Sequence, residues 1–506
     1  MKLMPRLRRR RFLLFVGLLT LGVLYQNSQA HAEEWSFRVT FDKSVHAEPY
    51  SGRVYLFFSR LNEESRQGPD WFHPEYFIAL DVENWEPASP LTFSAEKPGE
   101  MLAYPEPLDK MPIGGYRAQA VVRFNPWERE VGTGAGNGFS PVATLPEKAP
   151  AKPIEFNVGE LVPAPKFNES KWCKLLAVKS PRLSEFYGRE VTVNASVLLP
   201  ASYYDEPDRR YPVMYTIPGF GGTHFHGQSD RSIEEKNKNG VEFIRVMLDP
   251  SCPLGHHVFA DSDNNGPWGT ALIEDFIPAL DKEYRSVAAP TARFLTGHSS
   301  GGWSSLWLQV TYPEQFGGVW STAPDPVDFR DFQRINLYRP GENMYEDAAG
   351  KRRPLARNGE QVLLWYHDFA DMEDVLGPGG QLHSFEAVFS PRGDDGTPEL
   401  LWNRNTGEIE TDVAKTWERY DIRLVLENNW PTLGPKLKGK LHVYMGEEDT
   451  FYLEGATRRL KESLANLNSD AVVEMIPGGT HFNLLTPALR NKIRAEMVET
   501  FLEHHP

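Results

Sequence analysis

The segment Arg293–Gly302, RFLTGHSSGG, constrains the fold more than any other part of the chain. It contains a G-x-S-x-G pentad centred on Ser299, with an apolar run before it and a helix-like run after it that stops at Tyr312-Pro313. The motif needs this strand–turn–helix context, because a strained turn lifts the serine hydroxyl above the edge of a sheet. We therefore predict that Ser299 is a nucleophile. The alternative is a glycine-rich turn with no chemistry.

A nucleophilic serine needs a histidine to take its proton and an acid to orient that histidine. Asp449 directly follows the apolar run Leu441–Gly446, and His481 follows the run that ends near Ile476. When serine, acid and histidine follow core strands in that order, the pattern is typical of an α/β-hydrolase. The sequence therefore predicts Ser299, Asp449 and His481 as a catalytic triad.

Other residues compete for these roles. For the acid, the alternatives are Glu447, Glu448 and Asp325, and Asp325 follows a strand one place too early. The competing histidines His224, His226, His256 and His257 precede the serine and would break the chain order, whereas His442 lies inside a predicted strand. Chain order therefore favours Asp449 and His481.

Acyl transfer also requires hydrogen-bond donors for the oxyanion. We expect one donor to be the backbone N–H of Ser300, directly after the nucleophile. The other should come from the loop Pro218–Gly222, PGFGG, in which the N–H of Phe220 is the first choice and that of Gly221 the second. The alternative is that this loop is only a tight turn.

Four further residues are predicted to contact the substrate at the rim of the site: His298, Asp261, Asn265 and Trp268. The segment Asp261–Gly266 also matches the first half of a calcium-binding loop. Its twelfth position would be Leu272, which has no carboxylate, so no metal site is expected there. No cofactor is implied by any other motif.

Residue pattern and composition divide the chain into three parts after the N-terminus. Residues 33–145 alternate like short strands and predict a small antiparallel β-sandwich, and the proline-rich residues 146–166 predict a linker. Residues 167–506 alternate strands with helices, which predicts a mostly parallel sheet, with a lid or cap at about 325–436. The aromatic residues of the β part are either a sugar-binding face or ordinary packing: Trp71, Phe72, Tyr76 and Phe77.

The N-terminus predicts export. Six positively charged residues and the apolar run Phe12–Leu24 precede Ala30-His31-Ala32, as in a signal peptide at 1–32 that is cleaved near Ala32. Its removal would take the net charge from −15 to about −21, which argues against nucleic acids and anionic membranes as partners. The two cysteines, Cys173 and Cys252, could form one disulfide, but their spacing does not decide it.

Four motifs together resemble the esterase D-like branch of the α/β-hydrolases, the putative esterase family, which includes enterochelin and feruloyl esterases. They are Tyr211-Pro-Val-Met-Tyr with the PGFGG loop, Glu274–Arg285, the pentad, and Gly478-Gly-Thr-His-Phe. The resemblance covers about 175–324 and 436–490 and implies the same triad. Many members have a histidine where Pro218 stands, and the block 325–436 is unlike the compact members, so the ester is not implied.

The sequence thus predicts an exported serine hydrolase that cleaves a small-molecule or glycan-linked carboxylic ester through an acyl-enzyme on Ser299. Three alternatives stay open: an acyltransferase, a peptidase of the prolyl-oligopeptidase type, and a non-catalytic binding protein on the same scaffold. A propeller would be typical of such a peptidase, and 33–145 is too short for one.

Overall fold

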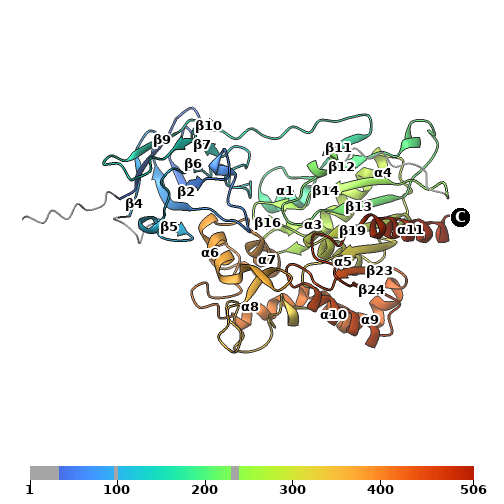
Figure 1. Ribbon diagram of the computed structural model, residues 1–506. Coiled ribbons are helices and arrows are strands. Elements are labelled where there is room, and N and C mark those ends of the chain that lie inside the picture. The colour runs from blue at the N-terminus through green and yellow to red at the C-terminus, as the bar shows by residue number, and fades with distance from the viewer. Residues whose placement is uncertain (1–33, 96–100, 230–238) are drawn as a thin grey trace, which may run out of the picture.

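The computed structural model describes residues 34–95, 101–229 and 239–506, so the predicted signal peptide at 1–32 lies outside the described residues. An all-β part lies at one end of the molecule and an α/β part at the other (Figure 1). We call residues 34–161 the β domain. The α/β domain begins with strand β11 at Cys173.

An eight-stranded sheet forms the centre of the α/β domain. Its order is β11-β12-β14-β13-β19-β20-β23-β24. The six strands from β14 to β24 are parallel to one another, β12 runs antiparallel to them, and β11 runs antiparallel to β12. The strands are β11 (Cys173–Lys179), β12 (Thr192–Leu198), β13 (Val213–Ile217), β14 (Ile244–Leu248), β19 (Arg293–His298), β20 (Gly318–Thr322), β23 (Leu441–Gly446) and β24 (Val472–Ile476). The predicted alternation of strands and helices is present.

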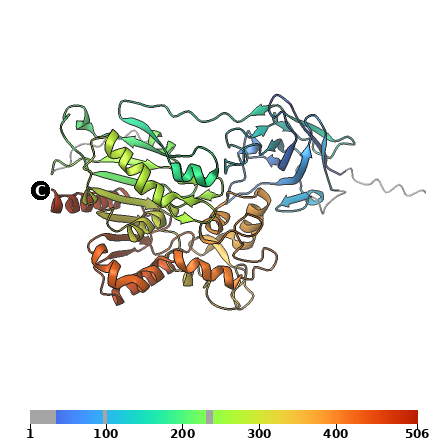
Figure 2. The same cartoon turned by 180° about the vertical axis from the view of Figure 1, so that it is seen from behind.

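Helices cover both faces of this sheet, which explains why its central strands are apolar along their whole length (Figures 1 and 2). Phe294 and Trp320 pack against α11 (Pro487–His504), while their neighbours Leu295 and Val319 share the opposite core. That second core includes α4 (Ile277–Glu283) and α5 (Ser300–Thr311). The remaining helices are α1 (Pro181–Tyr187), α2 (Phe225–Ser229), α3 (Trp268–Ala271) and α10 (Glu454–Asn466).

Two sheets make up the β domain and share one hydrophobic core. One has the order β4-β1-β9, and the other β10-β7-β6-β2-β3-β5, with β8 beside β6. Their strands are β1 (Ser36–Phe41), β2 (Tyr50–Ser59), β3 (Phe77–Trp85), β4 (Leu91–Ser94), β5 (Met101–Tyr104), β6 (Arg117–Val122), β7 (Gly138–Phe139), β8 (Ala143–Thr144), β9 (Ile154–Val158) and β10 (Glu160–Leu161).

Strand β2 is buried on both faces. Val54, Leu56 and Phe58 point into the core of the β domain. Because side chains alternate along a strand, Tyr55 and Phe57 point the other way, and they join the large core that runs through the α/β domain. The β domain is therefore docked through an apolar face of its sheet.

The apolar face of the β domain packs against the segment between β20 and β23, residues 323–440. We call it the cap segment. Its many buried aromatic and aliphatic side chains belong to the core of the α/β domain, so it is a folded layer and not an irregular block. Its elements are β21 (Pro354–Asn358), β22 (Gln361–Trp365), α6 (Tyr366–Leu376), α7 (Gln381–Phe389), α8 (Thr411–Thr416) and α9 (Ile422–Leu437).

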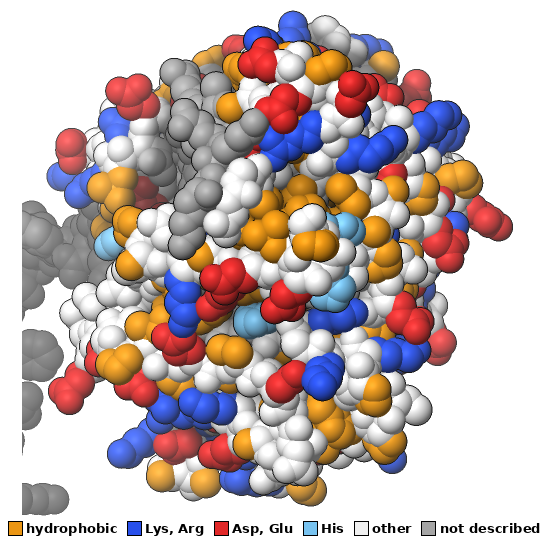
Figure 3. All heavy atoms as spheres, turned by 90° about the vertical axis from the view of Figure 1, so that its right-hand side faces the viewer, with side chains coloured by type: hydrophobic (Ala, Val, Ile, Leu, Met, Phe, Trp, Pro, Cys, Tyr) orange, Lys and Arg blue, Asp and Glu red, His pale blue; other side chains and the backbone are white. Residues whose placement is uncertain are grey.

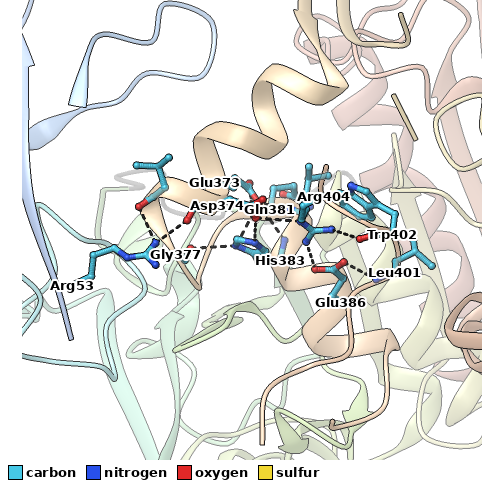
Figure 4. Close-up of polar contacts among 12 residues, drawn as sticks. Arg53, Glu373, Asp374, Gly377, Gln381, His383, Glu386, Leu401, Trp402 and Arg404 are labelled. Atoms are coloured by element: carbon cyan, nitrogen blue, oxygen red, sulfur yellow. Dashed lines mark hydrogen bonds and ion pairs between the residues drawn. The ribbon is translucent and has the colours of Figure 1, made fainter. Parts of the chain in front are cut away.

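Polar contacts fix the β domain to the C-terminal end of α6 (Figure 4). Arg53 donates to the carbonyls of Asp374 and Val375 at 2.7 and 3.0 Å, and the Tyr55 hydroxyl donates to that of Leu376 at 2.6 Å. The last carbonyls of a helix lack partners within it, so these bonds satisfy groups that would otherwise be unpaired. A cation at this end also interacts favourably with the helix dipole.

A buried polar network continues from α6 into α7 (Figure 4). The Glu373 carboxylate accepts the N–H groups of Gln381, Leu382 and His383 at the start of α7, and burial raises its pKa. Burial opposes the charge on His383, but the carboxylates of Asp374 and Glu373 raise the pKa of its imidazole overall. These bonds hold the turn between the two helices.

On the face farthest from the β domain, Lys and Arg side chains are interspersed with Asp and Glu, and neither sign dominates (Figure 3). Across the described ranges, no helix is both long and apolar enough to cross a membrane.

Candidate active site

Ser299 lies between the end of β19 and the start of α5, with φ 60° and ψ −128°. A non-glycine residue with positive φ is strained, and such strain is typical of functional positions. Close packing explains the glycines around it: a Cβ on Gly301 would lie 2.0 Å from the Ile217 carbonyl oxygen, and one on Gly219 would lie 3.2 Å from the Ser299 Cβ. The serine is thus presented at the carboxyl edge of the parallel strands.

Asp449 and His481 lie at the same edge, in the loops after β23 and β24. The Nδ1–H of His481 donates to Oδ2 of Asp449 at 2.8 Å, and both residues are buried. The other oxygen of Asp449 accepts the backbone N–H of Phe451 at 2.8 Å. This arrangement fixes the imidazole ring and leaves its Nε2 for proton transfer.

His298 contacts the backbone of His481. Its Nε2–H donates to the carbonyl oxygen of His481 at 3.0 Å, and its Nδ1 lies 3.1 Å from the Thr322 hydroxyl. Burial lowers the pKa of His298 to about 4, so it is neutral near pH 7. In this structure its two ring nitrogens contact the protein and not the open cavity, and its predicted role in substrate binding stays a prediction.

A second acid, Asp325, faces the serine. Its carboxylate accepts the Ser300 hydroxyl at 2.5 Å and the Ser299 hydroxyl at 3.4 Å. It is buried, and desolvation raises its pKa to about 6. Between the described side chains of Ser299 and His481 the structure shows no hydrogen bond, so the Ser299 hydroxyl must rotate away from Asp325 to reach the imidazole.

A small cavity of about 40 Å³ opens beside Ser299. Its walls are mostly aromatic and aliphatic side chains from the cap segment and from the loop after Asp449. The lining residues are Trp71, Ser299, Asp325, Pro326, Gln333, Leu355, Phe369, Gln381, Leu382, Phe385, Phe451 and Leu453. Among these, Trp71 belongs to the β domain.

The loop Pro218–Gly222 passes the serine at Gly219. His256, whose pKa burial lowers to about 4, donates from Nε2 to the carbonyl of Pro218 at 3.0 Å. The ring of Phe220 contacts Trp71 (5.6 Å between centroids) and the guanidinium of Arg129 (4.7 Å from the ring centroid). Both of these residues belong to the β domain, which therefore helps to hold the predicted oxyanion loop. The Ser300 N–H, at the first position of α5, has no partner within the helix.

The other three residues predicted at the rim, besides His298, do not line the cavity beside Ser299. Asp261 is exposed and bonds to Thr270, and the buried Asn265 lies 3.5 Å from the Cys252 thiol. Trp268 stacks on His257, 3.8 Å between centroids, and lines a separate cavity near Trp127. Substrate contact by these residues stays a prediction.

Cys173 and Cys252 are buried and are not joined to each other. Within the ranges that the structure describes, no group of three or more His, Cys, Asp or Glu side chains is arranged to hold a metal ion.

Trp71 and Phe72 were not predicted to lie at the site. The aromatic residues of the β domain were predicted to form either a sugar-binding face or ordinary packing, and in the structure they lie in different environments. Phe77 is fully buried, whereas Phe72 contacts Phe451 and Phe482, beside His481. The only signal in the sequence is two adjacent aromatic residues in a polar loop, which does not show what they contact.

The Esterase family profile, described as putative esterase, matches residues 184–470. The comparison with curated proteins finds no match.

Among solved structures, the chain is similar to an S-formylglutathione hydrolase from Agrobacterium tumefaciens, with 12% identity over 65% of this chain and 95% of that one and a TM-score of 0.40. It is similar to the fluorophosphonate-binding serine hydrolase FphF of Staphylococcus aureus, with 12% identity over 64% and 98% and a TM-score of 0.39. It is also similar to a ferulic acid esterase from Anaeromyces mucronatus, with 17% identity over 65% and 92% and a TM-score of 0.33.

The family match spans more than half of the 506 residues and includes the pentad, the PGFGG loop and Asp449. The chain is an esterase and belongs to the putative esterase family of α/β-hydrolases.

Proposed function

We propose that this esterase is an exported serine hydrolase that cleaves carboxylic esters through an acyl-enzyme on Ser299, with Asp449 and His481 as its acid and base. The observation that carries the proposal is the strained turn at Ser299 at the same sheet edge as the 2.8 Å pair of His481 and Asp449. The strain lifts the hydroxyl above the sheet, and the pair supplies an oriented base.

In the proposed reaction, Ser299 Oγ attacks the ester carbonyl while Nε2 of His481 takes its proton. Asp449 holds the imidazole in the required tautomer and stabilises the imidazolium. The N–H groups of Ser300 and of Phe220 or Gly221 bind the oxyanion. His481 then protonates the leaving alcohol, and water releases the acyl group by the reverse sequence.

Labelling with a fluorophosphonate tests this proposal without assuming a substrate. We expect the reagent to modify Ser299, as located by mass spectrometry, and Ser299→Ala to abolish both labelling and ester hydrolysis, with kcat falling by about 10⁴-fold or more. Ser305→Ala, on the same helix, is the matched control, since its hydroxyl only bonds to Gly302. Labelling at another residue, or full hydrolysis by Ser299→Ala, would contradict the proposal.

The proposal of export rests on the sequence of residues 1–32. After expression in a secreting host, we expect the N-terminus of the exported protein to follow Ala32. A protein that stays inside the cell with residues 1–32 attached would refute export and leave the catalytic proposal intact.

A further inference from the structure

Trp71 separates two cavities of very different size. The cavity beside Ser299 has a volume of about 40 Å³, and a second cavity of about 410 Å³ lies between the β domain, the oxyanion loop and α6. Trp71 lines both, whereas Ser299 lines only the small one. The side chain of Trp71 is therefore a partition between them.

Contacts with three elements hold the indole ring in place. Its centroid lies 5.6 Å from that of Phe220, 5.0 Å from Phe369 on α6 and 6.5 Å from Phe451 in the loop after Asp449. The last two contacts are edge-to-face, a geometry that aromatic pairs favour. The ring thus spans from the oxyanion loop to the cap segment.

The loop that carries Trp71 is itself anchored. The Asp70 carboxylate accepts the N–H groups of Phe72 and His73 at 2.9 and 2.8 Å, a local turn that fixes the backbone on either side. Nearby, Arg66 donates to the carbonyl of Gly132 at 2.7 Å, within the β domain. The position of Trp71 is therefore set by the β domain.

The small cavity fits the acyl half of an ester. His481 must protonate the leaving alcohol, so the alcohol departs on its side, yet His481 is not part of the cavity lining. The part of the substrate that remains on Ser299 is the acyl group, and the mostly apolar cavity beside Ser299 is the space available to it. A volume of 40 Å³ admits roughly three water-sized groups, which corresponds to an acyl chain of about two to four carbons.

We infer that Trp71 of the β domain determines acyl-chain length, by closing the cavity beside Ser299 to all but short acyl groups. This inference rests on the proposed acyl-enzyme at Ser299. Removing the indole ring joins the small cavity to the large one, where apolar side chains such as Met372 and Leu376 can receive a longer chain.

The test compares p-nitrophenyl acetate, butyrate, hexanoate and octanoate. For the wild type we expect kcat/KM to fall beyond butyrate. For Trp71→Ala we expect the ratio of kcat/KM for hexanoate to that for acetate to rise about tenfold or more, because each accommodated methylene adds binding in the transition state. Trp127→Ala is the matched control, since Trp127 is an exposed tryptophan of the same domain that lines neither cavity, and it should follow the wild type.

Fluorophosphonate labelling of each variant separates the two ways to fail. If wild type and Trp71→Ala both label at Ser299 but share one chain-length profile, the inference about Trp71 is wrong and the proposed function stands. If the folded wild type neither labels nor hydrolyses any ester, the proposed function is wrong and the inference falls with it. Should Trp71→Ala not fold, Trp71→Leu opens a smaller passage, and an unchanged profile in that variant would equally overturn the inference.

Discussion

On one side of the cavity beside Ser299 lie the loops that follow the parallel strands, and on the other lie the cap segment and Trp71 of the β domain. The first side places Ser299, Asp449 and His481 at strand ends, where the backbone of the sheet sets their positions. The second side is assembled from residues far apart in the chain, such as Trp71, Phe369 and Phe385. Under the proposed function, the first side performs the reaction and the second selects the substrate.

The largest effect is expected from a substitution at Asp449, on the first side alone. Asp449→Asn keeps the shape of the side chain but cannot hold the His481 tautomer, so we expect kcat to fall by about 10⁴-fold. The melting temperature should change little by comparison. Glu448→Gln, an exposed neighbour, is the control and should leave kcat unchanged. Steady-state kinetics and thermal unfolding of both variants would show whether reaction and stability separate in this way.

Asp325 lies between the two sides, and its charge gives a pH-dependent test. Because its pKa is raised to about 6 in the folded state, the folded protein binds this proton more tightly than the unfolded one. The stability linked to this group is therefore present below about pH 4 and is lost as the pH rises through 6. Asp325→Asn cannot titrate, so we expect it to be more stable than the wild type at pH 8, by up to ~3 kcal/mol, and to lose that advantage at pH 4.

Urea unfolding at both pH values measures this difference, and a pH-independent difference would contradict the assignment. Steady-state kinetics of Asp325→Asn add a second measurement, since the Ser299 hydroxyl in this variant loses a charged acceptor that competes with His481.

On the second side, Glu373→Gln should lower stability while leaving Ser299 reactive. The carboxylate accepts three N–H groups at the start of α7, and an amide replaces one of its oxygens with a donor. We expect the free energy of unfolding to fall by about 2 kcal/mol. The exposed Glu399→Gln is the control. Fluorophosphonate labelling that disappears in a folded Glu373→Gln protein would show that the two sides are not independent.

The smallest effect concerns the docking of the β domain. Arg53→Ala removes bonds to two helix-end carbonyls, and we expect a loss of about 1 kcal/mol in the free energy of unfolding. Asp81→Asn breaks only the exposed pair between Asp81 and Arg53 and should change it by less than about 0.5 kcal/mol. Equal losses in the two variants would mean that the contacts with α6 contribute nothing measurable.

The two sides also differ in how far the sequence predicts them. The positions of the pentad, Asp449 and His481 at the strand ends could be predicted because a strand end and a chemical residue type are both visible in a short segment. The contacts of Trp71 with Phe220 and Phe369, and of Asp325 with the Ser299 and Ser300 hydroxyls, could not be predicted in this way, since they join residues that lie far apart in the sequence. The cap segment looked irregular because its apolar side chains follow no single period, although they are buried against several different elements.

Strand β2 has a consequence for how the β domain finds its correct pairing. An ordinary strand of a sandwich has an apolar inner face and a polar outer face. A shift of its pairing by one residue would therefore expose its apolar side chains, which is unfavourable. From Val54 to Phe58 both faces are apolar, and such a shift would keep apolar side chains on both. The hydrogen bonds of the Tyr55 hydroxyl and the Arg53 guanidinium then specify the register of the strand, because only one alignment brings these groups to the end of α6.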